Sequence, residues 1–152
     1  MPWGFFDRAA QNDLCGGGAF PFLSDSHFFK LTMGLGEGTN NFAELMSLKL
    51  LLIFAEEQGC MNITVFGDFL NVVNWINETQ QCRNIILENL LSSIRLVLHR
   101  IDLFNCQHVY RESNEEAYKA SKEGLQMAMG SWKVKETREG RSHEFYHRPY
   151  ID

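Results

Sequence analysis

The segment from Phe42 to Ala55 constrains the fold most, because its apolar residues lie nearly all round a helical wheel. A helix of this kind is buried on most of its faces. Thr39 or Asn40 can cap its start, the helix runs to about Gln58, and Gly59 is a typical C-terminal stop. With 152 residues, the chain is long enough for one domain with a single sizeable core around such a helix.

Extended segments lie on both sides of this helix. Three precede it and are joined by short connections, which indicates an antiparallel meander. Two follow it, and a helix between two strands favours a right-handed crossover and parallel pairing. We therefore predict an α/β domain with one mixed five-stranded sheet, made of three antiparallel strands and two parallel additions, flanked by helices. The segments are Trp3–Phe6, Cys15–Leu23, Ser26–Leu35, Met61–Phe66 and Leu103–Tyr110.

Three further helices are expected. Leu70–Ile76 follows the fourth strand directly, and Ile85–His99 is amphipathic, with Ile86 on its apolar face. Ser113 and Glu116 have the spacing of a capping box, which predicts the start of a last helix. This last helix carries small residues on one face, which favours close packing on the sheet.

The C-terminal segment 131–152 differs from the rest of the chain. It carries charges of both signs and shows neither helical nor strand periodicity over a useful length. We therefore predict a domain over residues 1–130, followed by a charged tail that is partly disordered.

Composition excludes several classes of protein. No apolar run approaches the roughly 18–20 residues that span a bilayer, and no basic segment followed by an apolar one marks a secretory leader. We therefore expect an intracellular protein with no membrane partner.

The four cysteines lack C-x-x-C spacing, which indicates reduced thiols rather than a zinc site. A net charge of −5 argues against a nucleic-acid coat protein, but it allows an enzyme that meets nucleic acid through bound metal ions.

Three acidic residues stand at informative places. Asp7 follows the first apolar run, Glu44 is in the first turn of the long helix, and Asp68 ends the fourth strand. If the first and fourth strands are parallel neighbours, Asp7 and Asp68 lie side by side. Glu44 can reach the same point only if the long helix begins there. Carboxylates this close repel one another and take up protons unless a cation joins them. Mg²⁺ prefers oxygen ligands of this type, so we predict a Mg²⁺ or Mn²⁺ site.

Each acid also has a simpler structural explanation. Asp7 can be a turn residue, Glu44 can interact with the helix dipole, and Asp68 can cap the next helix. Each explanation is sufficient by itself, whereas all three acids in this order of elements favour a shared site.

Four segments carry a resemblance to a known family. In order, they resemble the motifs of type-1 ribonuclease H, above all the run Thr-Asn-Asn-Phe-Ala-Glu-Leu, and the similarity extends from residue 3 to about residue 130. Plant retroelement-derived ribonuclease-H-like domains, often found at the end of reverse-transcriptase-like polyproteins, look most similar. The segments are Phe5–Ala9, Thr39–Leu45, Val65–Asp68 and His108–Tyr118.

The resemblance implies a function. Members of this family hydrolyse the RNA strand of RNA–DNA hybrids with two Mg²⁺ ions held by four carboxylates, and they read shape and 2′-hydroxyls rather than base sequence. It implies that Asp7, Glu44 and Asp68 are catalytic metal ligands, and that Asn41 contacts the hybrid backbone. No small-molecule cofactor is expected, since Gly16–Gly18 lacks the Lys-Ser/Thr ending of a phosphate-binding loop.

The chain departs from the family pattern at the site itself. Tyr118 stands in place of the fourth carboxylate, and a phenol with a pKa of about 10 is a poor Mg²⁺ ligand. Arg8 and Phe69 replace small residues after the first and third acids. Glu115, one helical turn before Tyr118, is a possible substitute ligand. We therefore expect one metal ion rather than two.

Three functions remain open at this point. The first is a ribonuclease-H-like nucleic-acid-binding domain with reduced or absent catalysis, bound to an RNA–DNA hybrid or another nucleic acid. The second is a still-active ribonuclease H that favours Mn²⁺. The third is a catalytically inactive interaction module that kept only the fold.

Overall fold

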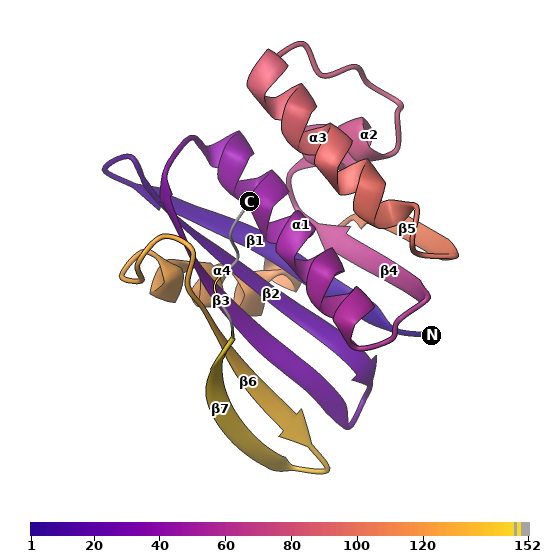
Figure 1. Cartoon of the computed structure of the whole chain (residues 1–152), viewed down its shortest axis with the longest axis vertical. Coiled ribbons are helices and arrows are strands. Elements are labelled where there is room, and N and C mark those ends of the chain that lie inside the picture. The colour runs from indigo at the N-terminus through magenta and orange to yellow at the C-terminus, as the bar shows by residue number, and fades with distance from the viewer. Residues whose placement is uncertain (148, 150–152) are drawn as a thin grey trace.

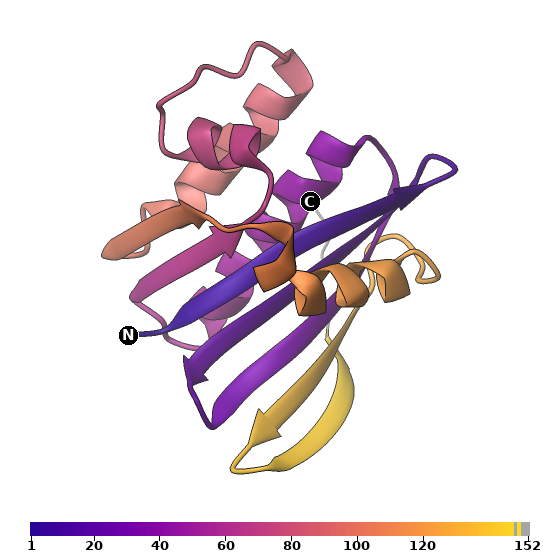
Figure 2. The same cartoon turned by 180° about the vertical axis from the view of Figure 1, so that it is seen from behind.

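The structure is a computed structural model that describes residues 1–147 and 149. Its strands are β1 (Trp3–Gln11), β2 (Leu14–Ser24), β3 (His27–Glu37), β4 (Asn62–Gly67), β5 (Leu103–His108), β6 (Trp132–Arg138) and β7 (Arg141–His147). Its helices are α1 (Asn40–Glu57), α2 (Leu70–Ile76), α3 (Ile85–Leu98) and α4 (Glu115–Gly124), with a short 3-10 helix at Arg111–Ser113. All strands form one sheet in the order β5-β4-β1-β2-β3-β6-β7, with helices on both faces (Figures 1 and 2).

The sheet topology confirms the predicted α/β class. β1, β2 and β3 form an antiparallel meander, while β4 pairs in parallel with β1 and β5 pairs in parallel with β4. α1 is the crossover helix between β3 and β4. The sheet has seven strands, however, and the prediction of five was wrong.

The two additional strands come from the segment predicted to be a tail. β6 pairs with the outer side of β3, and β7 pairs with β6, antiparallel in both cases. Glu139 and Gly140 connect them with φ values of 51° and 78°, the two positive values of a tight hairpin turn. Only Trp132 and Val134 of this hairpin are fully buried. Two apolar positions are too few to show the alternation that predicts a strand. The expected disorder is wrong for this hairpin, and residues 148 and 150–152 lie outside the described part.

α1 lies on the face of the sheet turned towards the viewer in Figure 1, opposite to α4. The Thr39 hydroxyl accepts a hydrogen bond from the Phe42 backbone N–H at 3.2 Å and caps its start. α1 packs on β1, β2 and β3 with one side and on α3 with another, so residues such as Leu48 and Leu51 are completely buried. This confirms the helix buried on most faces.

The apolar face of α3 is shifted from the predicted one. Its buried residues are Leu87, Leu91, Ile94 and Val97, whereas the side chain of Ile86 is 72% exposed. The expectation for Ile86 was therefore wrong. Ile86 and Leu90 are four residues apart and share one side of the helix, but the side that packs on the core is the neighbouring one, which carries Leu87.

α4 covers the opposite face of the sheet, where it crosses β1, β2 and β3 (Figure 2). It lies so close to β2 that a Cβ atom on Gly16 would be 2.1 Å from the Ser121 carbonyl oxygen, and one on Gly18 would be 2.3 Å from that of Ala117. The predicted close packing is thus confirmed, and it depends on glycines in the sheet as much as on small residues in the helix.

The predicted capping box at Ser113 is not formed. Ser113 ends the 3-10 helix, and Asn114 takes the cap position of α4 without a side-chain hydrogen bond to the helix. The side chain of Asn114 is used elsewhere, as described below.

Two expectations from composition concern the whole chain. All four cysteines are buried and free, in agreement with reduced thiols. Among the described residues, the helices are all too short or too polar to cross a membrane.

Candidate metal centre

The pairing of two parallel strands brings Asp7 and Asp68 together. Phe5 of β1 pairs with Phe66 of β4, and the same register, continued by two residues, places Asp7 beside Asp68. Asp7 lies in the middle of β1 rather than at its end, since β1 continues to Gln11. The acids therefore meet where β4 ends and β1 continues, paired only with β2.

Glu44 reaches the same point from α1. It is in the second turn of the helix, not in the first as expected, because the helix begins at Asn40. One carboxylate oxygen from each of Asp7, Glu44 and Asp68 lies within 4.8 Å of the other two. Oxygens bound to one Mg²⁺ at about 2.1 Å are at most about 4.2 Å apart, so small side-chain rotations bring all three into range.

Burial gives this cluster an unusual chemistry. Residues Glu44 and Asp7 are 0% and 1% exposed. Within the described part of the chain, both carboxylate oxygens of Glu44 and the Oδ2 atom of Asp68 are buried without a hydrogen-bond partner. Leaving buried carboxylates without partners costs several kcal/mol per charge. A hard divalent cation would supply the missing interactions, so these residues fit such an ion.

The carboxyl groups respond to burial as expected. Loss of hydration raises the pKa of Asp7 from 3.8 to about 6, against a hydrogen bond from the Arg8 backbone N–H, which lowers it, while the charge of Asp68 raises it further. The pKa of Glu44 is raised well above its ordinary value, mainly by burial and then by the charge of Asp7. Without a cation, Asp7 and Glu44 therefore hold their protons to a higher pH than free carboxyl groups do.

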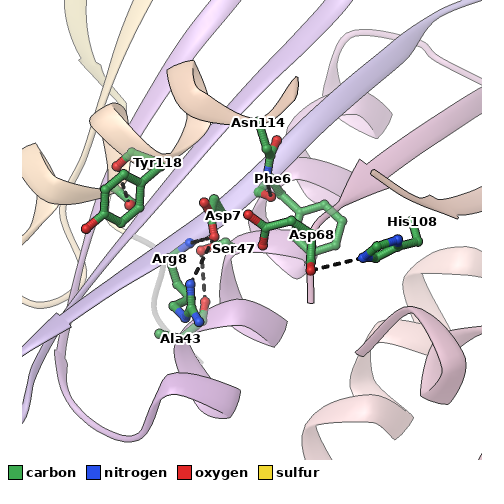
Figure 3. Close-up of polar contacts among 10 residues, drawn as sticks. Phe6, Asp7, Arg8, Ala43, Ser47, Asp68, His108, Asn114 and Tyr118 are labelled. Atoms are coloured by element: carbon green, nitrogen blue, oxygen red, sulfur yellow. Dashed lines mark hydrogen bonds and ion pairs between the residues drawn. The ribbon is translucent and has the colours of Figure 1, made fainter. Parts of the chain in front are cut away.

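Arg8 lies against the acid cluster (Figure 3). Oδ1 of Asp7 accepts a hydrogen bond of 2.8 Å from the Arg8 backbone N–H, and Arg8 Nη1 lies 3.2 Å from the same oxygen. The guanidinium carbon is 5.7 Å from the centre of the Phe69 ring. Two departures from the family pattern thus contact each other at the edge of the site.

Tyr118 projects from α4 and is 40% exposed (Figure 3). Its backbone carbonyl accepts a hydrogen bond from Ser121 Oγ at 2.6 Å. Glu115 does not join the acid cluster, and it lines a different hollow, next to Phe5 and Phe20. The alternative that Glu115 replaces the fourth carboxylate is therefore not supported by its position.

Asn41 lies one helical turn before Glu44 in α1. It is half-buried and lines a hollow of about 420 Å³ together with Phe42 and Leu87, beside the start of α1. Its contact with a hybrid backbone stays a prediction.

Reasoning from sequence missed two residues near the centre. The side-chain amide of Asn114 donates a hydrogen bond to the Phe6 carbonyl oxygen at 2.9 Å, and its place in the last motif was the available signal. The thiol of Cys106 lies close enough to Glu44 to sense its charge, and burial together with that charge raises the pKa of Cys106 to about 12. No sequence signal pointed to Cys106.

Comparisons with known proteins find similar folds. Ribonuclease H1 from the halophilic archaeon Halobacterium salinarum is 25% identical, with a TM-score of 0.78 over 84% of this chain and 98% of that one. LC11-RNase H1, isolated from compost and solved with an RNA/DNA hybrid, is 20% identical, with a TM-score of 0.74 over 82% and 96%. A foamy viral protease–reverse transcriptase, also solved with an RNA/DNA hybrid, is 13% identical, with a TM-score of 0.70 over 84% of this chain and 20% of the viral one.

No curated protein sequence matches the chain. A family model described as reverse transcriptase-like does match it, over residues 27–124, which is well over half of its length. The chain therefore belongs to the reverse transcriptase-like family, and its fold is that of type-1 ribonuclease H.

Proposed function

We propose that this chain binds an RNA–DNA hybrid over the end of β4, where Asp7, Glu44 and Asp68 meet, with one divalent cation at these acids and with reduced or absent hydrolysis. The buried, unpartnered carboxylate of Glu44 is the observation that carries the proposal. One of its oxygens lies within 4.8 Å of an oxygen of Asp7 and of Asp68, an arrangement that is unfavourable without a cation.

The three acids supply what such an ion requires. Asp7 and Asp68 offer oxygens from two neighbouring strands, and Glu44 offers one from the helix that packs on them. A bound Mg²⁺ or Mn²⁺ acts as a Lewis acid on a phosphoryl oxygen. The chain's own contribution is to hold the three carboxylates together beyond the end of β4, where Asp68 is the partly exposed member of the cluster.

Tyr118 is the reason for expecting little or no hydrolysis. Three carboxylates bring three negative charges, whereas two divalent ions bring four positive ones. A phenol with an ordinary pKa of about 10 stays neutral at physiological pH and adds no charge. Arg8 adds a positive charge beside Asp7 and disfavours a second cation further.

The RNA–DNA hybrid is proposed as the ligand because of the chain's family and because proteins of this fold recognise the shape of a duplex. Two of the similar structures hold RNA/DNA hybrids, although they share only 20% and 13% of residues with this chain. Proteins of this fold recognise a duplex by its shape, its phosphates and its 2′-hydroxyls. Asn41 is our candidate for a backbone contact, because it lies half-buried at the start of α1 next to a hollow.

One assay separates the candidate functions. A fluorescently labelled RNA–DNA hybrid is incubated with the purified chain in Mg²⁺ or Mn²⁺, and binding and cleavage are measured together. We expect binding that weakens steeply with salt, with little cleavage. Cleavage that Asp68→Asn abolishes would instead establish an active ribonuclease H. If no hybrid binds even at low salt, the proposal is wrong, and the interaction module, which the net charge of −5 favours modestly, takes its place.

A further inference from the structure

A polar hollow of about 400 Å³ adjoins the acid cluster on the far side of Arg8. It lies at the edge of β1 beyond Phe5, the last residue of β1 that pairs with β4, and it is bounded by the start of α1 and by α4. Three cationic side chains line it. Its lining includes Arg8, Arg111 and Lys122, together with Gln11, Asn40 and Tyr118.

These cations are only partly neutralised: the charges of Arg8 and Arg111 act on Asp7, whose pKa both lower. Among the residues that the structure describes, neither Arg111 nor Lys122 forms an ion pair with an acid. Lys122 Nζ instead lies 5.7 Å from the centre of the Tyr118 ring. Arg8 uses Nη1 for Asp7, but its Nε is buried without a hydrogen-bond partner. Three positive charges around one hollow repel one another and attract an anion.

The departures from the family pattern at Tyr118 and Arg8 change the charge of the site in the same direction. Relative to the family pattern, Tyr118 in place of a carboxylate removes one negative charge, and Arg8 in place of a small residue adds one positive charge. The sum is two positive charges, which equals the charge of one divalent cation. Both side chains line the same hollow.

We propose that Arg8, Arg111 and Lys122 form a phosphate-binding pocket that replaces the second metal ion. The pocket holds a backbone phosphate of a bound nucleic-acid strand, next to the phosphate that faces the three acids. Guanidinium groups suit this role, because they bind phosphate oxygens through two parallel hydrogen bonds and never lose their charge. This inference rests on the proposed function for its natural ligand, but the pocket itself can be tested without a hybrid.

The first test uses a nucleoside 5′-monophosphate in EDTA, so that neither a metal nor a duplex is required. Binding is followed by chemical-shift changes in NMR spectra, with the unphosphorylated nucleoside as the reference ligand. We expect the monophosphate to bind with a millimolar Kd and the nucleoside not to bind. The double variant Arg111→Gln/Lys122→Gln should weaken binding at least tenfold. Lys119→Gln, on the same helix but paired with Glu116, is the matched control and should change nothing.

Arg8 allows a test with two opposite effects. Arg8→Gly should weaken monophosphate binding in EDTA, and it should also strengthen Mg²⁺ binding in calorimetry, because it removes a positive charge beside Asp7. A change that merely damages the fold would weaken both. Equal monophosphate binding by the wild type, by Arg8→Gly and by the double variant would overturn the inference.

Binding of the hybrid distinguishes this inference from the proposed function. In a salt titration, the slope of log K against log salt should fall by about 1 for each cation removed from the pocket. If the wild type binds the hybrid and both Arg111→Gln and Lys122→Gln keep its slope, the pocket inference fails and the proposed function stands. If monophosphate binding needs the pocket but the hybrid does not bind, the proposed function fails and the phosphate site stands.

Discussion

The side-chain amide of Asn114 donates a hydrogen bond of 2.9 Å to the carbonyl oxygen of Phe6, and thereby ties the start of α4 to β1 one residue before Asp7 (Figure 3). Asn114 is 2% exposed, so water does not compete for this bond. The position of α4, and with it that of Tyr118, is therefore coupled to the strand that carries the first acid.

Replacing Asn114 should loosen this connection. Asn114→Ala leaves the Phe6 carbonyl buried without its partner, which costs about 1–3 kcal/mol of unfolding free energy. Urea unfolding measures the loss, and calorimetry should show weaker Mg²⁺ binding in the same variant. Asn105→Ala, at an exposed position on β5, is the control and should lose less than about 0.5 kcal/mol. Equal losses in the two variants would argue against a role for this hydrogen bond.

The stability of the metal-free protein should fall as pH rises. The pKa of Asp7 is raised from 3.8 to about 6 in the folded state, so the folded chain holds this proton after the unfolded chain has released it. The resulting loss begins near pH 3.8, is complete above about pH 6 and amounts to about 3 kcal/mol. The raised pKa of Glu44 acts in the same direction.

Urea unfolding in EDTA from pH 4 to pH 7 tests this dependence. Asp7→Asn cannot ionise, so its unfolding free energy should exceed that of the wild type at pH 7, with the gap closing towards pH 4. Mg²⁺ should stabilise the wild type at pH 7 and leave Asp7→Asn almost unaffected. A wild-type protein that is more stable at pH 7 than Asp7→Asn in EDTA would contradict the assigned direction.

Restoring the fourth carboxylate should restore affinity for divalent ions. Tyr118→Asp adds a charged oxygen ligand at a position 40% exposed, so the fold should tolerate it. We expect Mg²⁺ to bind at least tenfold more tightly in calorimetry, with a second ion detectable at high concentration. Tyr110→Asp makes the same change at a tyrosine that is 77% exposed, and it should have no effect on Mg²⁺. Identical Mg²⁺ titrations for wild type and Tyr118→Asp would remove Tyr118 from the site.

The close approach of α4 to the glycines of β2 predicts that larger residues there destabilise the fold. In Gly18→Ala, the new methyl group would lie 2.3 Å from the Ala117 carbonyl oxygen, a backbone atom that cannot move without the helix. We expect a loss of about 3 kcal/mol or more in urea unfolding. In Gly4→Ala the nearest atoms are side-chain carbons of Leu51 at 3.2 Å, which can rotate, so the loss should be smaller. The reverse order would mean that α4 can shift away from the sheet.

The sequence predicted the parts of the fold that have a strong apolar signal. The helix with Leu48 and Leu51 was recognisable because a helix that is apolar on all sides must be buried on most of them, here between the sheet and α3. The convergence of Asp7 with Asp68 followed from parallel pairing alone. The hairpin at Glu139 and Gly140 was missed because its buried period covers only two positions, although a glycine in that turn was a usable signal.

The candidate site was predictable in its members but not in its environment. Asp7, Glu44 and Asp68 stand at positions that strand order and motif order both indicate. The pocket around Arg111 and Lys122 depends on how close α4 lies to β1, which is decided by tertiary packing across distant segments. No local pattern in the chain contains that information.

The hairpin formed by β6 and β7 has a consequence for the tendency of this chain to aggregate. β3 has Phe29, Leu31 and Met33 fully buried, and β6 occupies the hydrogen-bonding groups along its outer side. A chain cut at residue 130 would expose that long apolar strand as a template for edge-to-edge aggregation. In the intact chain the outermost strand is β7, where Arg141, His143 and Glu144 face the solvent, and such charged side chains discourage a further strand from adding.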